Sequence, residues 1–130
     1  MNEYKNKTIL ITGASSGIGE TFAYRLNDLG ANLILTARSK DKLDKMALEM
    51  KHAQVISGDL SDPTFPNILY SEIKKMNLTV DILINNAGFG YSGKFLDSSM
   101  ENYEEMINLN ICSLVHLSHL FLKDMVQNKK

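Results

Sequence analysis

The chain has 130 residues, which gives room for one domain with a hydrophobic core. Its 44% hydrophobic and 22% charged residues are typical of a globular protein, and the net charge of -1 gives no electrostatic reason to expect nucleic acid or a membrane as partner. The single cysteine, Cys112, excludes an internal disulfide, and no apolar run approaches the ~18 residues of a membrane-spanning helix. We therefore expect a cytoplasmic protein.

A strand, a glycine-rich loop and a helix are predicted at the start of the chain. Residues 8–11 are apolar and β-rich, and residues 20–26 carry apolar side chains at helical spacing. Between them, residues 12–19 read TGASSGIG, with glycines at i, i+4 and i+6 rather than the i, i+2 and i+5 of the general dinucleotide fingerprint. Glycines let the backbone approach a phosphate closely, and a helix N-terminus offers it free amides. A chance glycine turn is the alternative.

The next elements follow from the positions of apolar residues and punctuating glycines. A first helix is predicted over 16–29, ended by Gly30, and its expected buried stripe is Ile18, Phe22, Leu26 and Leu29. A second strand is predicted over 32–37. Ser39 is a reasonable N-cap for a second helix, whose apolar face is Leu43, Met46, Ala47 and Met50. A short third strand covers 54–57.

The second half of the chain continues the alternation. After a loop over 61–66, a third helix is predicted to face inward with Ile68, Leu69, Ile73 and Met76. Residues 80–85 are apolar enough for a strand covered on both faces, and a long helix is predicted over 99–127, with Ser98 and Glu101 at capping-box spacing. Strands alternating with helices through short connections predict an α/β fold with a parallel sheet.

Three motifs in this order resemble those of the short-chain dehydrogenases/reductases. They are the Thr12-Gly13-x-x-x-Gly17-x-Gly19 loop, Asp59-Leu60 after the third strand, and Asn85-Asn86-Ala87-Gly88 after the fourth. The resemblance covers essentially the whole chain but only the first half of such an enzyme. It implies a truncated Rossmann-type doubly wound sheet with strand order 3-2-1-4, in which residues 1–130 are the N-terminal, NADP-binding part of one domain. Ligands of such sheets bind beyond the carboxyl ends of the strands, here between the first and fourth.

NADP(H) is the expected cofactor because of the residues that follow the second strand. NAD sites usually place an acidic residue there to bind the ribose 2′-OH, whereas this chain has Ala37 and Arg38. Arg38 can pair bidentately with a 2′-phosphate, and Ser39 can add a hydroxyl. In the family, a basic residue just after this strand goes with NADP. The alternative is a solvated arginine that merely starts a helix.

The resemblance also implies the rest of the cofactor site. Asp59 is expected to accept a hydrogen bond from the adenine amine, with Leu60 lining the adenine pocket, although a turn or capping aspartate is the alternative. Asn86, Ala87 and Gly88 are expected to pass along the cofactor ribose. The complete set of expected cofactor-binding residues is Gly13, Ser15, Ser16, Gly17, Ile18, Gly19, Arg38, Ser39, Asp59, Leu60, Asn86, Ala87 and Gly88.

Asn110 is the one catalytic residue expected in this chain. At about 100° per residue it shares a helix face with Tyr103, Met106, Ile107, Leu114, Leu117 and Phe121, which should pack on the sheet. An unpaired buried amide costs about 1–3 kcal/mol, so a plain core position is unattractive. The family has an asparagine here that fixes a water in a proton relay with the catalytic lysine. A satisfied core asparagine without a catalytic role is the alternative.

The family's catalytic serine, tyrosine and lysine are expected on segments that come after Lys130. Tyr70 and Lys74 match Tyr-x-x-x-Lys by letter, but they precede the Asn-Asn-Ala-Gly strand, so we interpret the match as coincidental. The resemblance thus implies an oxidoreductase that transfers hydride between NADP(H) and an unidentified carbonyl or alcohol substrate, with this chain alone inactive. A catalytically inactive dinucleotide-binding or assembly module is the alternative.

The outer side of the last helix is the remaining feature. Cys112, His116 and His119 fall at i, i+4 and i+7, but three ligands from one helix rarely suffice, so no metal is expected. Ile111, Val115 and Leu122 flank this strip on one side and Leu109 and Leu120 on the other. A helix that is apolar around most of its circumference favours a second partner. In the family this helix helps to form the dimer interface, so we expect a homo-oligomer.

Overall fold

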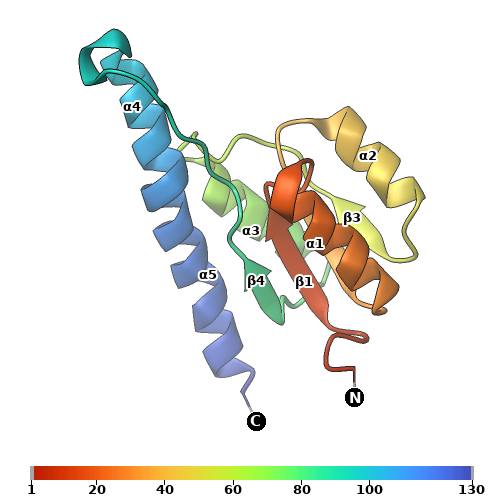
Figure 1. Cartoon of the computed structure of the whole chain (residues 1–130). Coiled ribbons are helices and arrows are strands. Elements are labelled where there is room, and N and C mark those ends of the chain that lie inside the picture. Colours follow the sequence, from red (N-terminus) through yellow and green to blue (C-terminus); the bar gives the residue numbers. More distant parts are fainter. Residues whose placement is uncertain (1, 130) are drawn as a thin grey trace.

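The computed structural model describes residues 2–129 and contains a four-stranded parallel sheet in the order β3-β2-β1-β4, as predicted (Figure 1). All strands end at the upper edge of the sheet in Figure 1, where the loops that follow them meet. The strands are β1 (Thr8–Thr12), β2 (Asn32–Thr36), β3 (Ala53–Val55) and β4 (Ile82–Ile84).

The strands β3 and β4, which lie at the two edges of the sheet, are shorter than predicted. Backbone pairing nevertheless continues beyond β3, since the Ile56 amide donates to the Leu35 carbonyl at 3.0 Å. The prediction that β4 is covered on both faces is confirmed, since Ile82 and Ile84 pack against one hydrophobic core and Leu83 packs against the other. All three residues are nevertheless only half-buried, because within residues 2–129 the outer edge of β4 has no neighbouring strand.

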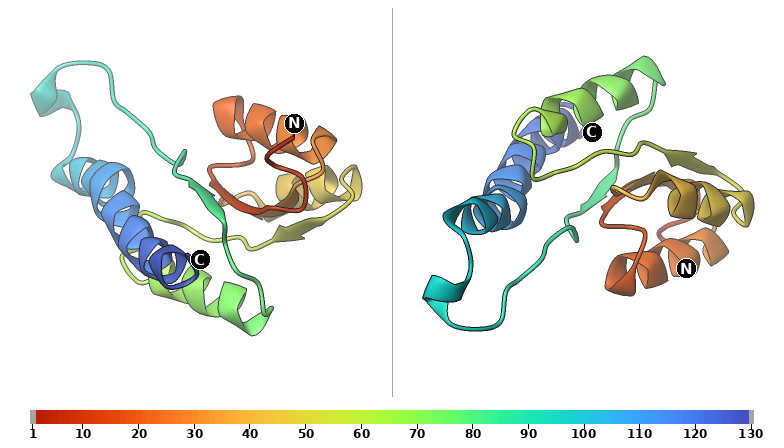
Figure 2. Two further views of the ribbon diagram at one scale, coloured as in Figure 1. Left: turned by 90° about the horizontal axis from the view of Figure 1, so that it is seen from below. Right: turned by 90° about the horizontal axis from the view of Figure 1, so that it is seen from above.

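Helices cover both faces of the sheet, which makes the fold doubly wound (Figure 2). On one face lie α1 (Gly17–Asp28) and α2 (Lys40–Leu48), and on the other lie α3 (Phe65–Lys75) and α5 (Ser113–Gln127). Alternate residues of the strands feed two cores. Ile9, Ile11 and Leu33 belong to the α1–α2 core, whereas Leu10 and Ile34 pack with residues of α3 and α5. This is the pattern expected of strands buried on both sides.

The predicted buried stripe of α1 is wrong at two positions. Ile18 and Phe22 are 70% and 43% exposed, and the residues that face the sheet are Gly19, Ala23 and Leu26. The reason is close packing at the glycine loop, where a Cβ on Gly19 would collide with the Gly13 carbonyl. Only small side chains fit against the sheet at that distance. The end of the helix is as predicted, with Gly30 at a positive φ of +84°.

The predicted inner face of α3 is also partly wrong. Leu69 and Ile73 are buried, but Ile68 and Met76 are 49% and 38% exposed. Phe65 takes the remaining inward position, so that the buried line follows i, i+4 and i+8. The second helix matches its prediction better, because Leu43, Met46 and Met50 are all buried.

The predicted long helix over 99–127 is present from Met100 to Gln127, but a π-helical turn interrupts its α-helical pattern. A 3₁₀ turn, η1 (Phe95–Asp97), precedes α4 (Met100–Ile107), and a π-helical turn, η2 (Asn108–Cys112), joins α4 to α5. The predicted capping box of Ser98 and Glu101 is wrong, since the N-cap is Ser99, whose hydroxyl accepts from the Asn102 amide at 3.0 Å. Figures 1 and 2 show α4, η2 and α5 running as one long rod beside the sheet.

The predicted sheet-facing stripe of this region is confirmed at Leu117 and Phe121, which are buried, but it is wrong at three other positions because of the π turn. Each π turn contains an additional residue, so it shifts the angular position of the residues on either side of it. Asn110 is exposed, Ile107 is 50% exposed and Leu114 is 42% exposed. The inward residues of α5 are Ser113, Leu117 and Phe121.

Candidate functional site

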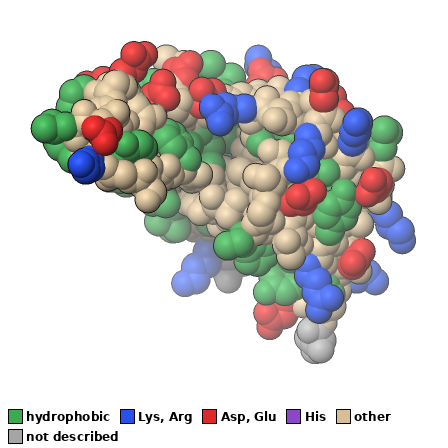
Figure 3. Space-filling view, turned by 45° about the horizontal axis from the view of Figure 1, so that its top comes forward, with side chains coloured by type: hydrophobic (Ala, Val, Ile, Leu, Met, Phe, Trp, Pro, Cys, Tyr) green, Lys and Arg blue, Asp and Glu red, His purple; other side chains and the backbone are tan. Residues whose placement is uncertain are grey.

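A cleft of about 350 Å³ lies at the carboxyl edge of the sheet, where the loops after all four strands meet. Nine of the predicted cofactor residues line it: Gly13, Ser15, Ser16, Arg38, Ser39, Asp59, Leu60, Ala87 and Gly88. Ala37, Lys42, Gly58, Phe89 and Leu109 complete the lining. Figure 3 brings this edge forward, and it shows basic side chains gathered with acidic ones on the right of the molecule and hydrophobic ones along the left arm.

The three glycines of the first loop are required for different physical reasons. Gly13 has a φ of +63° and packs against the loop after β4, where an added Cβ would lie 2.9 Å from the Asn86 amide nitrogen. Gly19 is buried in the same contact. Gly17 has open space around it, and its φ of +54° is what favours glycine there. The spacing i, i+4 and i+6 therefore reflects two close-packing positions and one turn position.

The start of α1 is left without a side-chain cap. Ser16 occupies the N-cap position but its hydroxyl makes no capping hydrogen bond, and the first helical bond runs from the Glu20 amide to the Ser16 carbonyl at 3.2 Å. The amides of the first turn are thus available to an anion, which the helix dipole also favours. Gly17 and Ile18 lie just outside the cleft, beside an exposed apolar patch that includes Phe22.

A basic pair borders the α2 end of the cleft. Arg38 and Ser39 are exposed in the connection after β2, as predicted, and among residues 2–129 Arg38 has no carboxylate partner. Sequence reasoning missed Lys42, which lines the same cleft and contacts Glu20 with an Nζ–Oε1 distance of 3.4 Å. The signal was available, since Lys42 stands four residues after Arg38 and in the first turn of the helix that follows it.

Asp59 is held in a tight turn beside the cleft. Its Oδ1 accepts hydrogen bonds from the Ser61 amide at 2.9 Å and the Ser61 hydroxyl at 2.7 Å. The turn aspartate weighed as an alternative is therefore present. Within residues 2–129 its Oδ2 has no hydrogen-bond donor, so one carboxylate oxygen is available for a ligand as well.

Thr12 and Asn86 join the first loop to the loop after β4. The Thr12 hydroxyl accepts from the amides of Asn86 and Ala87, both at 2.9 Å, and the Asn86 side chain donates to the Gly13 carbonyl at 3.1 Å. Asn86 therefore braces the glycine loop rather than lining the cleft. Ala87 and Gly88 line it, as expected.

Asn110 holds the loop beyond Gly88. Its Oδ1 accepts from the Phe89 amide at 3.1 Å, and its Nδ2 donates to the Phe89 carbonyl at 2.6 Å. A Cβ on Gly88 would approach the Asn110 side-chain oxygen too closely, which explains the glycine. Asn110 thus belongs to an exposed backbone clamp and not to the buried stripe in which it was expected.

Tyr70 and Lys74, the coincidental Tyr-x-x-x-Lys match, are both engaged with Asp124 of α5. The Tyr70 hydroxyl donates to the Asp124 carboxylate at 2.8 Å, and the Lys74 ammonium lies 2.7 Å from the same oxygen. The hydrogen bond to Asp124 raises the pKa of Tyr70 above its usual value, and burial raises it further. A catalytic tyrosine acting near neutral pH needs the opposite shift.

Two further features concern metals and membranes. Within residues 2–129 the structure groups no three His, Cys, Asp or Glu side chains in a way that could hold a metal ion. Cys112 and His119 are exposed, whereas His116 is half-buried. None of the helices in the described part of the chain is long and apolar enough to cross a membrane.

The fold and cleft define a Rossmann-type α/β protein with a site at the switch point of its sheet. Residues 7–130 match the family model described as short chain dehydrogenase, and the chain belongs to this family. The mouse protein "Dehydrogenase/reductase SDR family member 7" is 31% identical over 136 residues, covering 98% of this chain and 40% of that protein.

Solved structures of the family agree with the fold. L-sorbose reductase from Gluconobacter frateurii, complexed with NADPH and L-sorbose, superposes with a TM-score of 0.88 at 27% identity, over 96% of this chain and 50% of that one. A short-chain dehydrogenase from Sphingobium yanoikuyae in complex with NADPH has a TM-score of 0.86 at 36% identity, over 93% of this chain and 49% of that one. The chain therefore spans about half the length of the proteins that it resembles.

Proposed function

We propose that this chain is the NADP(H)-binding part of an oxidoreductase that transfers hydride between NADP(H) and a carbonyl or alcohol substrate. In this proposal residues 1–130 form the N-terminal part of one Rossmann domain. The observation that carries it is the single cleft where the glycine loop, Arg38, Asp59 and the loop after β4 meet. The NADPH complexes of two similar proteins support the choice of cofactor. A cytoplasmic location suits the free thiol of Cys112.

The residues present fit a dinucleotide from the pyrophosphate to the adenine. The uncapped first turn of α1, with Ser15 and Ser16 beside it, suits the pyrophosphate. We assign the free oxygen of Asp59 to the adenine amine and Leu60 to the adenine face. Asn86, Ala87 and Gly88 are assigned to the ribose, with Asn86 acting through the glycine loop that it braces.

The basic end of the cleft supports NADP(H) over NAD(H). Arg38 and Lys42 provide two positive charges and Ser39 a hydroxyl, while the position after β2 that would bind a ribose 2′-OH is occupied by Ala37. A guanidinium can hold a phosphate through two parallel hydrogen bonds. Lys42 adds a point charge that its contact with exposed Glu20 only partly offsets.

Asn110 is proposed to act in proton transfer by holding a water. An asparagine amide has two donors and two acceptor sites, and the clamp on Phe89 uses one of each. One donor and one acceptor remain for a water. When bound, the cofactor supplies or accepts the hydride.

Cofactor preference is the direct test of this proposal. We expect the wild type to bind NADPH more tightly than NADH in a fluorescence titration. Arg38→Ala should reduce the preference about 10- to 100-fold, which corresponds to the loss of a charge-assisted hydrogen bond. Lys42→Met should reduce it less. Lys51→Met is the matched control, because Lys51 is an exposed lysine that lines neither the cleft nor the adjoining hollow beside Arg38, Ser39 and Lys42. A wild type that binds both cofactors equally would contradict the proposal.

The same chain is expected to show no turnover when NADPH oxidation is followed over a panel of carbonyl compounds. The reason is that its one Tyr-x-x-x-Lys pair is bound to Asp124 and does not line the cleft. Turnover above background that disappears in Tyr70→Phe would overturn this assignment.

A second candidate, an assembly module without turnover, is favoured by one observation. The exposed side of η2 and α5 carries an apolar stripe, with Ile111, Val115 and Leu122 each more than half exposed, and Leu122 also borders a groove beside Ile82 and Leu83 of β4. Soluble monomers rarely expose large contiguous apolar surfaces. We propose that this stripe, the outer apolar stripe, contacts a second copy of the protein, and this assembly is compatible with either function.

A further inference from the structure

The π turn η2 is an unusual feature beside the cleft. The Ser113 amide donates to the Asn108 carbonyl, which closes an i→i+5 turn between α4 and α5. Such turns are rare and occur frequently at functional sites. Here Leu109 and Asn110 of the turn, together with Ser113 directly after it, lie against the cleft and two of the loops that line it.

The contacts of η2 and its next residue reach both loops. Leu109 lines the cleft directly, and Asn110 clamps Phe89 in the loop after β4. Ser113, the first residue of α5, donates its hydroxyl proton to the carbonyl of Leu60 in the loop after β3. The last contact joins residues that are 53 positions apart in the sequence.

The Ser113 contact is buried, whereas the Asn110 contact is exposed. Ser113 is 4% exposed and Leu60 is 6% exposed. Removing the hydroxyl would leave the Leu60 carbonyl without this partner in a site that water scarcely reaches, and a buried unpaired carbonyl is unfavourable. The loop would then relax toward a conformation that pairs its carbonyl elsewhere.

The residue before Leu60 is Asp59, whose carboxylate stands at the cleft. Two hydrogen bonds from Ser61 fix the Asp59 side chain relative to its own turn, but they do not fix the turn relative to the sheet. Contacts outside the turn must do that. The Leu60 side chain packs among Phe65, Leu69 and Leu117, and its carbonyl is held by Ser113.

We propose that Ser113 is a positioning residue for the adenine end of the cofactor site, acting through the Leu60 carbonyl. This inference rests on the proposed NADP(H) function. It predicts that the affinity for adenosine phosphates depends on a hydroxyl that does not line the cleft. The placement of α5 and the conformation of the adenine loop are then linked through one hydrogen bond.

The test measures binding of 2′,5′-ADP, which carries the adenine end of NADP without the nicotinamide, by calorimetry well below the melting temperature. Ser113→Ala should weaken binding about 5- to 20-fold, the range of one lost hydrogen bond. Ser118→Ala is the matched control on the same helix, because its hydroxyl accepts from Asn85 rather than from the adenine loop. The affinity of this control variant for 2′,5′-ADP should stay within about twofold of the wild-type affinity.

Hydrogen exchange separates positioning from a general loss of stability. In Ser113→Ala without ligand, the amides of Gly58 and Asp62, which bond to Ala37 and Asp59, should exchange faster while the β1 and β2 amides stay protected. Faster exchange throughout the sheet would indicate a merely structural role and overturn the inference. If the alanine variant does not fold, Ser113→Cys, which has similar size and a weaker donor, takes its place with the same expectations.

The outcomes distinguish the two proposals. If the wild type binds 2′,5′-ADP and the Ser113 variant binds it equally well, the positioning role fails and the NADP(H) proposal stands. If the wild type does not bind 2′,5′-ADP, the NADP(H) proposal fails and the positioning role fails with it. Exchange data from the ligand-free protein then still report whether Ser113 holds the Leu60 loop.

Discussion

Thr12 and Thr36 occupy paired positions in the register of β1 and β2, but their hydroxyls have opposite surroundings. Both residues are buried. The Thr12 hydroxyl accepts two backbone hydrogen bonds from the loop after β4, at 2.9 Å each. Within residues 2–129 the Thr36 hydroxyl has no hydrogen-bond partner. A buried polar group is favourable only when it is paired.

We therefore expect the same substitution, threonine to valine, to have opposite effects on the free energy of unfolding at the two positions. Thr12→Val should lower the free energy of unfolding by about 2–3 kcal/mol, because it leaves two amides unpaired. Thr36→Val should be neutral or stabilising by up to about 1 kcal/mol, because it removes an unpaired hydroxyl and keeps the shape. Urea denaturation of both variants tests this, and equal losses at the two positions would contradict it.

At the scale of elements, α3 and α5 are joined by a cluster of three side chains. Asp124 accepts from Tyr70 and pairs with Lys74, whose ammonium also lies 5.3 Å from the centre of the Tyr70 ring. Pairing with Lys74 lowers the pKa of Asp124, and pairing with Asp124 raises the pKa of Lys74. The Lys74 side chain is 45% exposed, so solvent screens part of this interaction.

The cluster predicts a specific dependence of stability on pH. Because the pKa of Asp124 is lowered in the folded state, its contribution to the free energy of unfolding is fully present above the unfolded-state pKa of about 3.9. This contribution is lost as pH falls through the folded-state pKa. Because the pKa of Lys74 is raised in the folded state, its contribution to the free energy of unfolding is fully present below the unfolded-state pKa of about 10.4. This contribution is lost as pH rises through the folded-state pKa. Asp124→Asn should cost about 1–2 kcal/mol of unfolding free energy at pH 7.

The measurement is the unfolding free energy of wild type and Asp124→Asn between pH 7 and pH 3. The difference between the two proteins should stay constant down to about pH 3.9 and shrink below it, since protonated Asp124 no longer pairs with Lys74. A difference that stays constant with pH would show that packing, rather than charge, accounts for the loss. Asp62, whose pKa is lowered by hydrogen bonds from Thr64, is the same in both proteins and cancels in the comparison.

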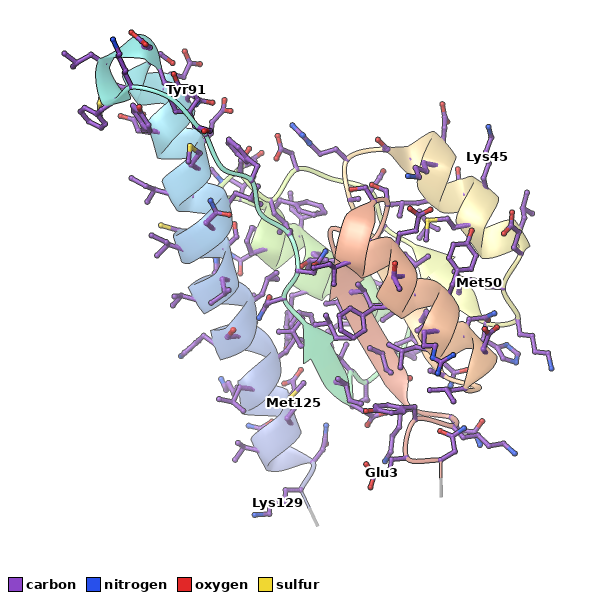
Figure 4. All side chains as sticks on the ribbon, viewed as in Figure 1. Glu3, Lys45, Met50, Tyr91, Met125 and Lys129 are labelled. Atoms are coloured by element: carbon purple, nitrogen blue, oxygen red, sulfur yellow. The ribbon has the colours of Figure 1, made fainter. Side chains whose placement is uncertain are left out.

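At the scale of the whole molecule, the helices of the α3–α5 layer differ in what covers them. The sheet-facing side of α5 is packed, and Met125 can be seen there in Figure 4 beside the sheet. The outer apolar stripe has no such cover within residues 2–129. Val115 in this stripe is 59% exposed, and Leu122 and Val126 are 57% and 64% exposed about two and three turns further along the helix.

This asymmetry predicts self-association through the outer apolar stripe. Wild type should sediment as a dimer or larger species at high concentration, because association buries apolar area worth about 25 cal/mol per Å². Val115→Glu should shift it to monomer. Leu48→Glu is the matched control, since Leu48 is 88% exposed but lies on α2, on the other side of the sheet. A wild type that remains monomeric at high concentration would contradict the prediction.

The order of elements and the meeting of four loops at one edge of the sheet could be predicted from the sequence, and the strand order and the family from its resemblance. These features follow from patterns that are read along the chain, namely the apolar strands, the glycine loop and the Asn-Asn-Ala-Gly motif. Motifs at successive strand ends must lie at one edge of a parallel sheet, whatever the details of packing.

The buried side of each helix could not be predicted reliably from the sequence, because it depends on how the packed elements fit together. The face of α1 depends on how closely Gly13 and Gly19 let the helix approach the sheet, so small residues took positions assigned to Ile18 and Phe22. The face of α5 depends on the π turn, which moved Asn110 out of the core. The bond from Ser113 to Leu60 joins distant segments. Such contacts depend on the distance and the rotation between packed elements, and these cannot be predicted from the local periodicity of the sequence.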